Sequence, residues 1–478
     1  MSAETNEVKK PSLLVALIPV VFMIVALIIG IAVYGADPHI PLFFSGVVAA
    51  AIALLLGNSW KTIESGMING ISLALQAIII LVIIGMIIGS WLAGGIVPTM
   101  IYYGLDILSP TYFLFASCII SGLVAIAAGN AWTAAGTIGI ALMGVGEGLG
   151  LNTAMVAGSV ISGIYFGDKI SPFSETTNLA PGVAGSELFE HIKHMLFTTV
   201  PALIISLILY FVLGFVTNHD NSNLEQVSTL QNQLSDLFTI GPLLLIVPAV
   251  VIIMMIKKMP AIPALSTGAI LGTVTAVLVQ GLPMKEAIST LYYGYSADTG
   301  VDVLDNLLNN GGIEAMMFTV SLIIIAMSFG GIMESTGFFQ TIVESLLSLA
   351  RSAGSLIGIT VGTSFFANVV GSEQYLSIII PARMYANAYD KKGLKMKNLS
   401  RTVEDAGTMT SPLVPWNTCG AFMTATLGVS TLSYAPFAFL CLLSPLMAII
   451  YGFTGFSVEY KDGHKKVSNM KAAKKTSV

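Results

Sequence analysis

Residues 167–178 interrupt apolar sequence with side-chain types that bind cations. They follow the apolar segment 153–166 and carry Asp168, Lys169 and Glu175 among hydroxyl and amide side chains. Ionisable groups at such depth in an apolar chain are costly, so they usually face a cavity and mark an ion or substrate path. Carboxylate, hydroxyl and amide oxygens are the hard ligands that small inorganic cations prefer. We therefore expect this stretch to form part of a Na⁺ site; the alternative is a polar surface loop between two helices.

A second stretch, residues 404–418, repeats this design. Acidic residues precede a Ser-Pro step in both stretches, at Ser171-Pro172 and at Ser411-Pro412. Proline lacks an N–H and clashes with the preceding helical turn, so each step predicts a helix break. Broken helices in secondary transporters expose backbone groups and helix ends to the transported ions. We therefore expect one broken transmembrane helix in each half of the chain.

The composition indicates an all-α polytopic membrane protein. The chain has 478 residues, of which 55% are hydrophobic and only 10% are charged, whereas about 25% are charged in soluble proteins. Several apolar runs are long enough to cross a bilayer. The predicted spans are 12–34, 40–56, 67–93, 195–217, 237–256, 262–281, 313–334 and 434–457, with interfacial pieces at 96–108 and 338–350.

Two shorter pairs of apolar segments predict re-entrant hairpins. Residues 112–128 and 131–149 meet at a tip around Asn130, and residues 355–390 contain a second tip around Glu373. Apolar packing does not explain an acidic residue at such a tip, and the helix ends there leave backbone groups unpaired. Each half is therefore expected to combine a hairpin with a broken helix.

The two halves also resemble each other in sequence. Three pairs of similar features recur in the same order: Trp60–Ser65 with Met284–Ser289, Gly129 with Gly371, and Ser171-Pro172 with Ser411-Pro412. Placing the N-terminus in the cytoplasm puts most Lys and Arg residues on that side, as the positive-inside rule requires. This holds if each half crosses the membrane an odd number of times, which inverts one half relative to the other.

The expected organisation follows from these patterns. Both termini are expected in the cytoplasm of a multi-pass membrane protein. The predicted segments are a cytoplasmic tail (1–11), a first transmembrane repeat (12–217), an external linker loop (218–236), a second, inverted repeat (237–458) and a basic cytoplasmic tail (459–478).

Glu175 is the leading candidate for a residue that carries Na⁺ and H⁺ in turn. It follows a proline break and has hydroxyl side chains on both sides, and Glu373 at the second hairpin tip is the next candidate. We hypothesise that Na⁺ binds at Glu175, Asn178 and Glu373. The full set of predicted ion or substrate ligands is Asn130, Thr133, Asp168, Ser171, Glu175, Thr176, Asn178, Ser372, Glu373, Ser411, Asn417 and Thr418.

Two basic residues fall within the predicted membrane region. Lys169 and Arg383 could balance the charge of these acids or hold a carboxylate substrate. The alternative for Asp168 is a purely structural salt bridge to one of these two, since structural ion pairs can mimic functional ones. Asp405 lies near a basic loop, where a solvated helix start is expected.

The sequence lacks the motifs of common hydrolases and of ATP-driven pumps. The sequence contains no His-Glu-x-x-His, no Gly-x-Ser-x-Gly and no P-loop, so hydrolysis and ATP-driven pumping are not indicated. We expect a transporter rather than an enzyme, with no cofactor and no nucleic-acid partner. The basic clusters suit lipid headgroups.

Residues 167–180 resemble the signature of the NhaC-type Na⁺/H⁺ antiporters of bacteria. The matching sequence is Gly-Asp-Lys-Ile-Ser-Pro-Phe-Ser-Glu-Thr-Thr-Asn-Leu-Ala, and Trp416-Asn417-Thr418 is similar too. The resemblance covers about residues 13–457. Family members often carry Asp where this chain has Glu175, which keeps the carboxylate. The resemblance implies a bacterial cell-membrane protein that extrudes Na⁺ in exchange for H⁺. It also implies the plan of the wider ion-transporter superfamily, with inverted repeats and hairpins.

The sequence is compatible with three functions. The first is Na⁺/H⁺ antiport, and the second is exchange of malate against lactate coupled to the same ions, which the resemblance also implies for some members. Lys169 and Arg383 favour the second if they face the cavity unpaired, and the first if they pair with the acids. The third is a passive cation channel, against which two buried helix breaks argue. The oligomeric state is open, and a homodimer is one assembly to test.

Overall fold

The computed structural model describes residues 10–217, 223–300, 304–305 and 308–461. The regular secondary structure of these residues is helical. The first half contains α1 (Leu13–Ile28), η1 (Ile29–Val33), α2 (His39–Leu55), α3 (Trp60–Ala93), α4 (Ile96–Ile107), α5 (Pro110–Ala128), α6 (Ala131–Ala134), η2 (Ala135–Gly139), α7 (Ile140–Gly148), α8 (Thr153–Ile170), α9 (Glu175–Ala184) and α10 (Leu188–Thr217). The helix α11 (Asn223–Leu237) follows.

The second half of the chain is helical as well. It contains η3 (Pro242–Leu245), α12 (Ile246–Ile256), α13 (Ala261–Leu278), α14 (Met284–Tyr293), α16 (Gly312–Ser335), α17 (Phe338–Leu347), α18 (Ala353–Val370), α19 (Gln374–Lys391), α20 (Met396–Val403), η4 (Glu404–Thr408), η5 (Ser411–Leu413), α21 (Thr418–Leu427), α22 (Thr431–Tyr434), η6 (Ala435–Phe437) and α23 (Phe439–Thr454).

Seven of the described helices are long and apolar enough to cross a membrane, and two bent helix pairs raise this number to nine. The seven include α5 and α18, the first arms of the two predicted hairpins. Apolar side chains along α1, α2 and α10 remain exposed, as expected for helices that face lipid. The chain is therefore a multi-pass membrane protein.

Both predicted helix breaks are present. The first helix ends at Ile170 and resumes at Glu175, with Ser171-Pro172 in the gap. The second break follows the π-helical turn η4 and continues through Ser411-Pro412 to α21. Proline at these positions prevents a continuous hydrogen-bond ladder, so four helix ends lie inside the protein.

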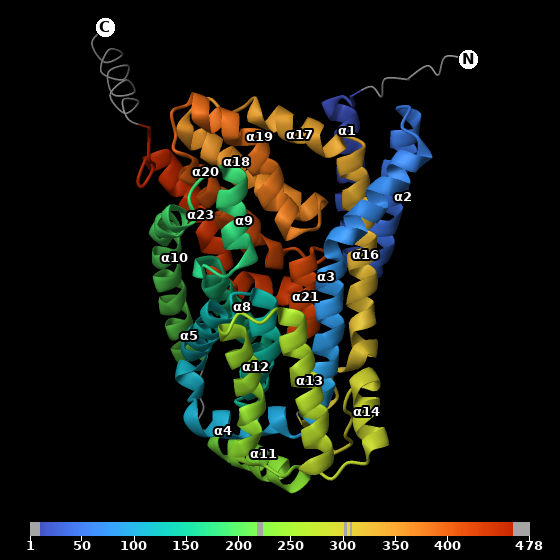
Figure 1. Cartoon of the computed structure of the whole chain (residues 1–478), viewed down its shortest axis with the longest axis vertical. Coiled ribbons are helices and arrows are strands. Elements are labelled where there is room, and N and C mark those ends of the chain that lie inside the picture. The colour runs from blue at the N-terminus through green and yellow to red at the C-terminus, as the bar shows by residue number, and fades with distance from the viewer. Residues whose placement is uncertain (1–9, 218–222, 301–303, 306–307, 462–478) are drawn as a thin grey trace.

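Two long helices, α3 and α16, pack side by side through the whole structure (Figure 1). Glycines allow their backbones to approach closely: a Cβ atom at Gly66 would lie 2.7 Å from the carbonyl oxygen of Gly331, and one at Gly331 would lie 2.1 Å from that of Gly66. Small residues serve this purpose in membrane helix packing. The α3–α16 pair therefore forms a fixed axis against which the broken helices pack.

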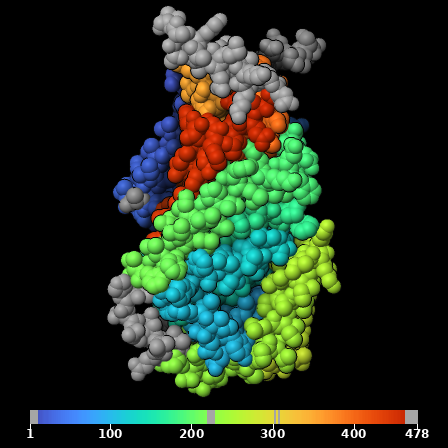
Figure 2. All heavy atoms as spheres, turned by 90° about the vertical axis from the view of Figure 1, so that its left-hand side faces the viewer, coloured from blue at the N-terminus to red at the C-terminus, as the bar shows by residue number. Residues whose placement is uncertain are grey.

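The remaining helices divide between the two ends of the molecule. Helices α17 and α20 and the start of α1 lie at one end, whereas α4, α11 and α14 lie at the other, which we call the α11 end (Figure 1). Lys10 pairs with Glu344 of α17, and Lys461 pairs with Asp390 at the end of α19. The first and last described residues therefore lie at the same end. Figure 2 shows the face on which α10 crosses diagonally above α5.

The predicted linker loop needs correction. Of residues 218–236, the first five lie outside the described residues, and the rest belong to the helix α11. Its apolar residues Leu230 and Leu234 are buried, and Gln231 donates hydrogen bonds to the Tyr102 carbonyl and to Asp106 of α4. The spacing of these leucines by one helical turn explains why a polar segment folds as a helix on α4.

Candidate functional site

Three helix N-termini meet at a small pocket, which we call the carboxylate pocket. It has a volume of about 60 Å³. The helices are α6, α9 and α19, which begin after the first hairpin tip, the first break and the second hairpin tip. The lining residues are Leu73, Gln76, Ala77, Ile80, Asn130, Ala131, Trp132, Asp168, Ser174, Glu175, Thr176, Glu373, Gln374 and Tyr375.

The two hairpin tips are built in the same way. Asn130 has extended backbone angles, and its side chain accepts hydrogen bonds from the backbone N–H groups of Trp132 and Thr133. Glu373 is also extended, and its Oε2 accepts a hydrogen bond at 3.1 Å from the N–H of Leu376. Each residue thus satisfies N–H groups that a helix start leaves unpaired. The cap in the second half is a titratable carboxyl group, whereas the cap in the first half is a neutral amide.

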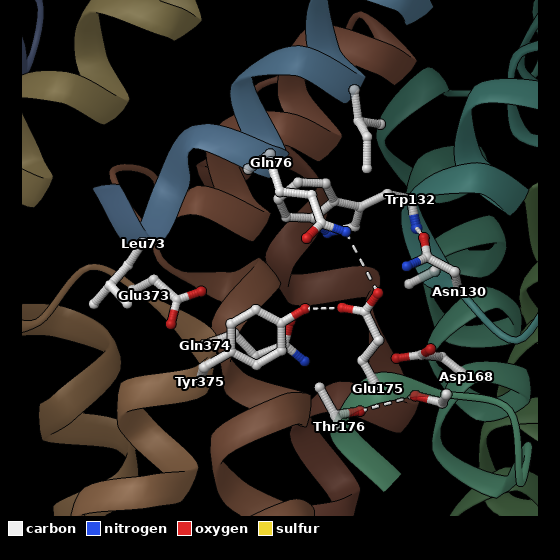
Figure 3. Close-up of a pocket in the computed structure, with 14 residues that line it drawn as sticks. Leu73, Gln76, Asn130, Trp132, Asp168, Glu175, Thr176, Glu373, Gln374 and Tyr375 are labelled. Carbon is white, nitrogen blue, oxygen red and sulfur yellow. Dashed lines mark hydrogen bonds between the residues drawn. The ribbon is translucent and has the colours of Figure 1, made fainter. Parts of the chain in front are cut away.

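Glu175 lies at the exposed side of the carboxylate pocket. Its Oε2 accepts a short hydrogen bond from the hydroxyl of Tyr375, and its Oε1 accepts one at 3.5 Å from Nε2 of Gln76. Figure 3 shows its carboxylate between Tyr375 and Asp168. Glu175 is the first residue of α9, where the positive end of the helix dipole favours a negative charge.

Two further carboxylates of the pocket are almost completely buried. Asp168 is 5% exposed and Glu373 is 4% exposed. No lysine or arginine belongs to the lining of this pocket within the described part of the chain. Burying an ionised carboxylate without a compensating charge is costly, so the pocket is suited to binding cations that come from outside the protein.

A larger cavity of about 320 Å³, which we call the side cavity, adjoins the carboxylate pocket. Both include Asn130 and Glu175, and the side cavity adds the predicted residues Thr133 and Asn178. It also includes Lys258, whose ammonium lies 4.8 Å from the ring centre of Phe173 in the first break. Neutral donors and one basic residue therefore lie beside the acidic site.

The other predicted residues of the two breaks contribute contacts between elements. Ser171 donates a hydrogen bond at 2.9 Å to the Ile126 carbonyl of α5, and Asn417 donates to Asn368 of α18. The N–H of Thr418 bonds to the carbonyl of Ser372 at 3.0 Å. Ser411 of η5 donates a hydrogen bond at 2.7 Å to the carbonyl of Thr408, the last residue of the π-helical turn η4. These four predicted residues and Ser372 do not line the carboxylate pocket.

Lys169 forms a different ion pair from the one expected. Its ammonium bonds to Asp405 and, at 2.6 Å, to Ser444, whereas the expected alternative was a salt bridge to Asp168. Asp405 is completely buried, so the expectation of a solvated helix start was wrong. Arg401 also faces Asp405, with Nε 3.9 Å from Oδ2. We call Lys169, Arg401 and Asp405 the ion-paired cluster.

Arg383 lies away from the carboxylates of the pocket. Its side chain is exposed on α19, and it does not line the carboxylate pocket or the side cavity. The structure therefore does not bring together Arg383 and the carboxylates whose charge it was expected to balance. Neither basic residue faces the pocket unpaired, which was the condition that would favour a carboxylate substrate.

Sequence reasoning missed three polar residues at this site. Gln76 is a single amide in a long apolar run, a signal that could have identified it, while Tyr375 and Gln374 directly follow a predicted ligand. Glu404 was expected, with Asp405, at a solvated helix start, and this expectation was wrong. It is fully buried in η4, where its Oε1 accepts a hydrogen bond at 2.8 Å from Thr408 and its Oε2 has no hydrogen-bond partner among the described residues.

Comparisons with known proteins find similar sequences that cover most of the chain. Residues 163–456 match the model of the Na⁺/H⁺ antiporter family. The chain is 40% identical over 437 residues to the Na⁺/H⁺ antiporter NhaC of Alkalihalophilus pseudofirmus, covering 91% of this chain and 94% of that protein. It is 39% identical over 456 residues to the malate-2H⁺/Na⁺-lactate antiporter of Bacillus subtilis (95% and 97% covered). It is also 38% identical over 457 residues to the arginine/ornithine antiporter ArcD of Halobacterium salinarum (95% and 94% covered).

Proposed function

This chain belongs to the Na⁺/H⁺ antiporter family, and we propose that its carboxylate pocket is where Na⁺ and H⁺ alternate during the exchange. The observation that carries the proposal is the convergence of Asp168, Glu175 and Glu373 on one small pocket whose described lining contains no basic side chain. Na⁺ and H⁺ are the two monovalent cations that can neutralise such carboxylates in turn. Competition between them for one site, combined with access to that site from alternate sides of the membrane, produces antiport.

Glu175 and Glu373 are the proposed charged ligands of Na⁺. They come from different halves of the chain and from two helix starts, at α9 and α19. Asn178 lies in the adjoining side cavity and uses its amide nitrogen to donate to the carbonyls of Pro172 and Ser174. Because the nitrogen is occupied by these two hydrogen bonds, the amide oxygen of Asn178 is the atom that would bind a cation.

Alternating access by two inverted repeats fits the arrangement of helices. The hairpin of α1 and α2 extends from the end with the termini, whereas that of α12 and α13 extends from the α11 end (Figure 1). The two caps at Asn130 and Glu373 support the same relation. In this proposal the exchange moves Na⁺ out of the cell, and both termini are cytoplasmic. The α11 end then faces the outside, so an impermeant thiol reagent added to intact cells should label Ser235→Cys in α11.

A second candidate function is Na⁺- and H⁺-coupled exchange of organic acids such as malate and lactate. The names of two relatives describe organic substrates, and the side cavity offers Lys258 with Asn130 and Thr133 as a carboxylate-binding set. Against it stands Lys169, whose charge is taken by Asp405.

Transport in proteoliposomes distinguishes the two functions. Na⁺ and L-malate are supplied separately against an imposed pH gradient, and proton flux is followed with a pH-sensitive dye. Na⁺ alone should drive proton movement, with protein-free vesicles as the control. Proton movement that requires malate would favour the second candidate, and none with either solute would contradict both.

A further inference from the structure

A third space, which we call the far cavity, lies toward the α11 end of the molecule. Its volume is about 280 Å³, and α3, α4, α7 and α21 contribute to its walls. Ile88, Ile140, Glu147, Thr153 and Thr426 are among its lining residues. None of these residues belongs to the carboxylate pocket or the side cavity.

The far cavity and the carboxylate pocket lie along the same elements. On α3, Ile80 lines the pocket and Ile88 lines the far cavity; along α6 to α7, Trp132 lines the pocket and Ile140 lines the far cavity. An α-helix rises 1.5 Å per residue, so each step corresponds to about 12 Å. The two spaces are therefore separated by a thin layer of side chains.

Aromatic and aliphatic side chains fill this layer. The rings of Trp132 and Phe422 are stacked, with centroids 4.5 Å apart and an interplanar angle of 16°. Ile84 packs against Gly136, where an added Cβ would lie 2.6 Å from its Cδ1. Gly136 belongs to the π-helical turn η2, and such turns are frequent at functional sites. The layer forms an apolar barrier between two polar spaces.

The side chains of the far cavity suit a cation. Glu147 supplies a half-buried carboxylate, and no lysine or arginine lines the cavity among the described residues. Thr426 is 3% exposed, and its hydroxyl has no hydrogen-bond partner in the described structure. An acidic cleft with low-dielectric walls raises the local concentration of cations.

We propose that the far cavity is the vestibule through which Na⁺ passes between the carboxylate pocket and the α11 end, with Glu147 attracting the ion. The inference rests on the proposed function of the pocket and adds a second Na⁺ site on the other side of the Trp132–Phe422 barrier. The barrier must open for an ion to cross. Once it is open, Na⁺ from the α11 end can reach the carboxylates of the pocket.

Glu147→Gln in proteoliposomes tests the vestibule by sidedness. The apparent Km for Na⁺ supplied at the α11 end should rise by about threefold or more because the attracting charge is lost. The Km for Na⁺ supplied at the other end and the maximal rate should not change. Asp106→Asn is the matched control, since Asp106 is an exposed acid at the same end and outside the cavity; its Km should stay at the wild-type value.

The sign of the charge is tested with Glu147→Cys. Modification of this cysteine by an anionic thiosulfonate should restore the low Km for Na⁺ supplied at the α11 end. Modification by a cationic thiosulfonate should raise this Km further. The wild-type cysteines are buried, and Ser235→Cys serves as a labelled control on α11. An equal response to both reagents, or a Km change of the same size from both ends, would overturn the proposal.

A second variant covers the case in which Glu147 variants do not fold. Thr426→Cys should react with reagent applied from the α11 end, and the adduct should block Na⁺-driven proton flux. Transport that continues after complete labelling would contradict the vestibule. A wild-type protein without any Na⁺-driven proton flux would instead contradict the proposed function, so the two failures are distinguishable.

Discussion

The ion-paired cluster and the carboxylate pocket treat buried acids in opposite ways. In the cluster, Asp405 receives Lys169, Arg401 and the hydroxyls of Thr198 and Ser444. In the pocket, Asp168 and Glu373 are buried to a similar degree, but the described lining supplies no basic residue. The cluster joins both broken helices through Lys169 and Asp405, whereas the pocket is lined by the first break and the two hairpin tips. The difference indicates that the cluster holds the breaks in place, whereas the pocket leaves its charges for transported cations.

Adjacent residues show this contrast most directly. Glu404 and Asp405 belong to one π-helical turn and are both fully buried. Asp405 points to the two basic residues. Glu404 forms no salt bridge in the described part of the structure, and one of its oxygens lacks a hydrogen-bond donor there; Asp168, Lys169 and Thr176 are among its electrostatic neighbours. These two consecutive acids of the π-helical turn thus have different hydrogen-bond and ion-pair partners.

The largest expected effect on transport comes from Glu373→Gln. The substitution removes a carboxylate that caps α19 beside the pocket, so Na⁺-dependent proton flux should fall by about 100-fold or more. The amide can still accept the capping hydrogen bond, and the amount of folded protein in the membrane should be preserved. Glu344→Gln, at an exposed acid paired with Lys10, is the control. Near-normal flux in Glu373→Gln would make this residue structural.

The largest expected effect on stability comes from Asp405→Asn. The change leaves Lys169 and Arg401 without their counter-charge in the interior, which should cost about 3–5 kcal/mol. Thermal unfolding in detergent measures this loss. Glu404→Gln, one residue away, should change the free energy of unfolding much less because no basic residue pairs with it in the described structure. Equal destabilisation by the two variants would remove the distinction between a buried acid with a salt bridge and one without.

The sequence predicted the fold better than it predicted the contacts. Apolar runs and proline positions located the spans and both breaks, because these signals are local. Helix α11 was missed because its apolar residues are few, and they become informative only when α4 lies against them. The termini orientation and the inverted repeats remain predictions.

Part of the candidate site was also visible in advance. Asn130, Asp168, Glu175, Thr176 and Glu373 do line one pocket, although their role in transport stays a prediction. The burial of Asp405 could not be predicted, since Lys169 is distant in sequence and no local pattern identifies it as the partner.

The central claim is that Na⁺ and H⁺ compete for the pocket, and the pH dependence of the apparent Km for Na⁺ tests it most directly. Na⁺-driven proton flux is measured in proteoliposomes from about pH 6 to 9, because buried carboxylates can titrate in this range. The Km should fall as pH rises, since fewer protons occupy the carboxylates, and should level off once the carboxylates are ionised. Glu175→Gln should lose exchange, because an amide cannot cycle a proton, while Glu175→Asp should remain active. A wild-type Km that is independent of pH would contradict competition between Na⁺ and H⁺ for the pocket, and an active Glu175→Gln with an unchanged pH profile would remove Glu175 from the exchange.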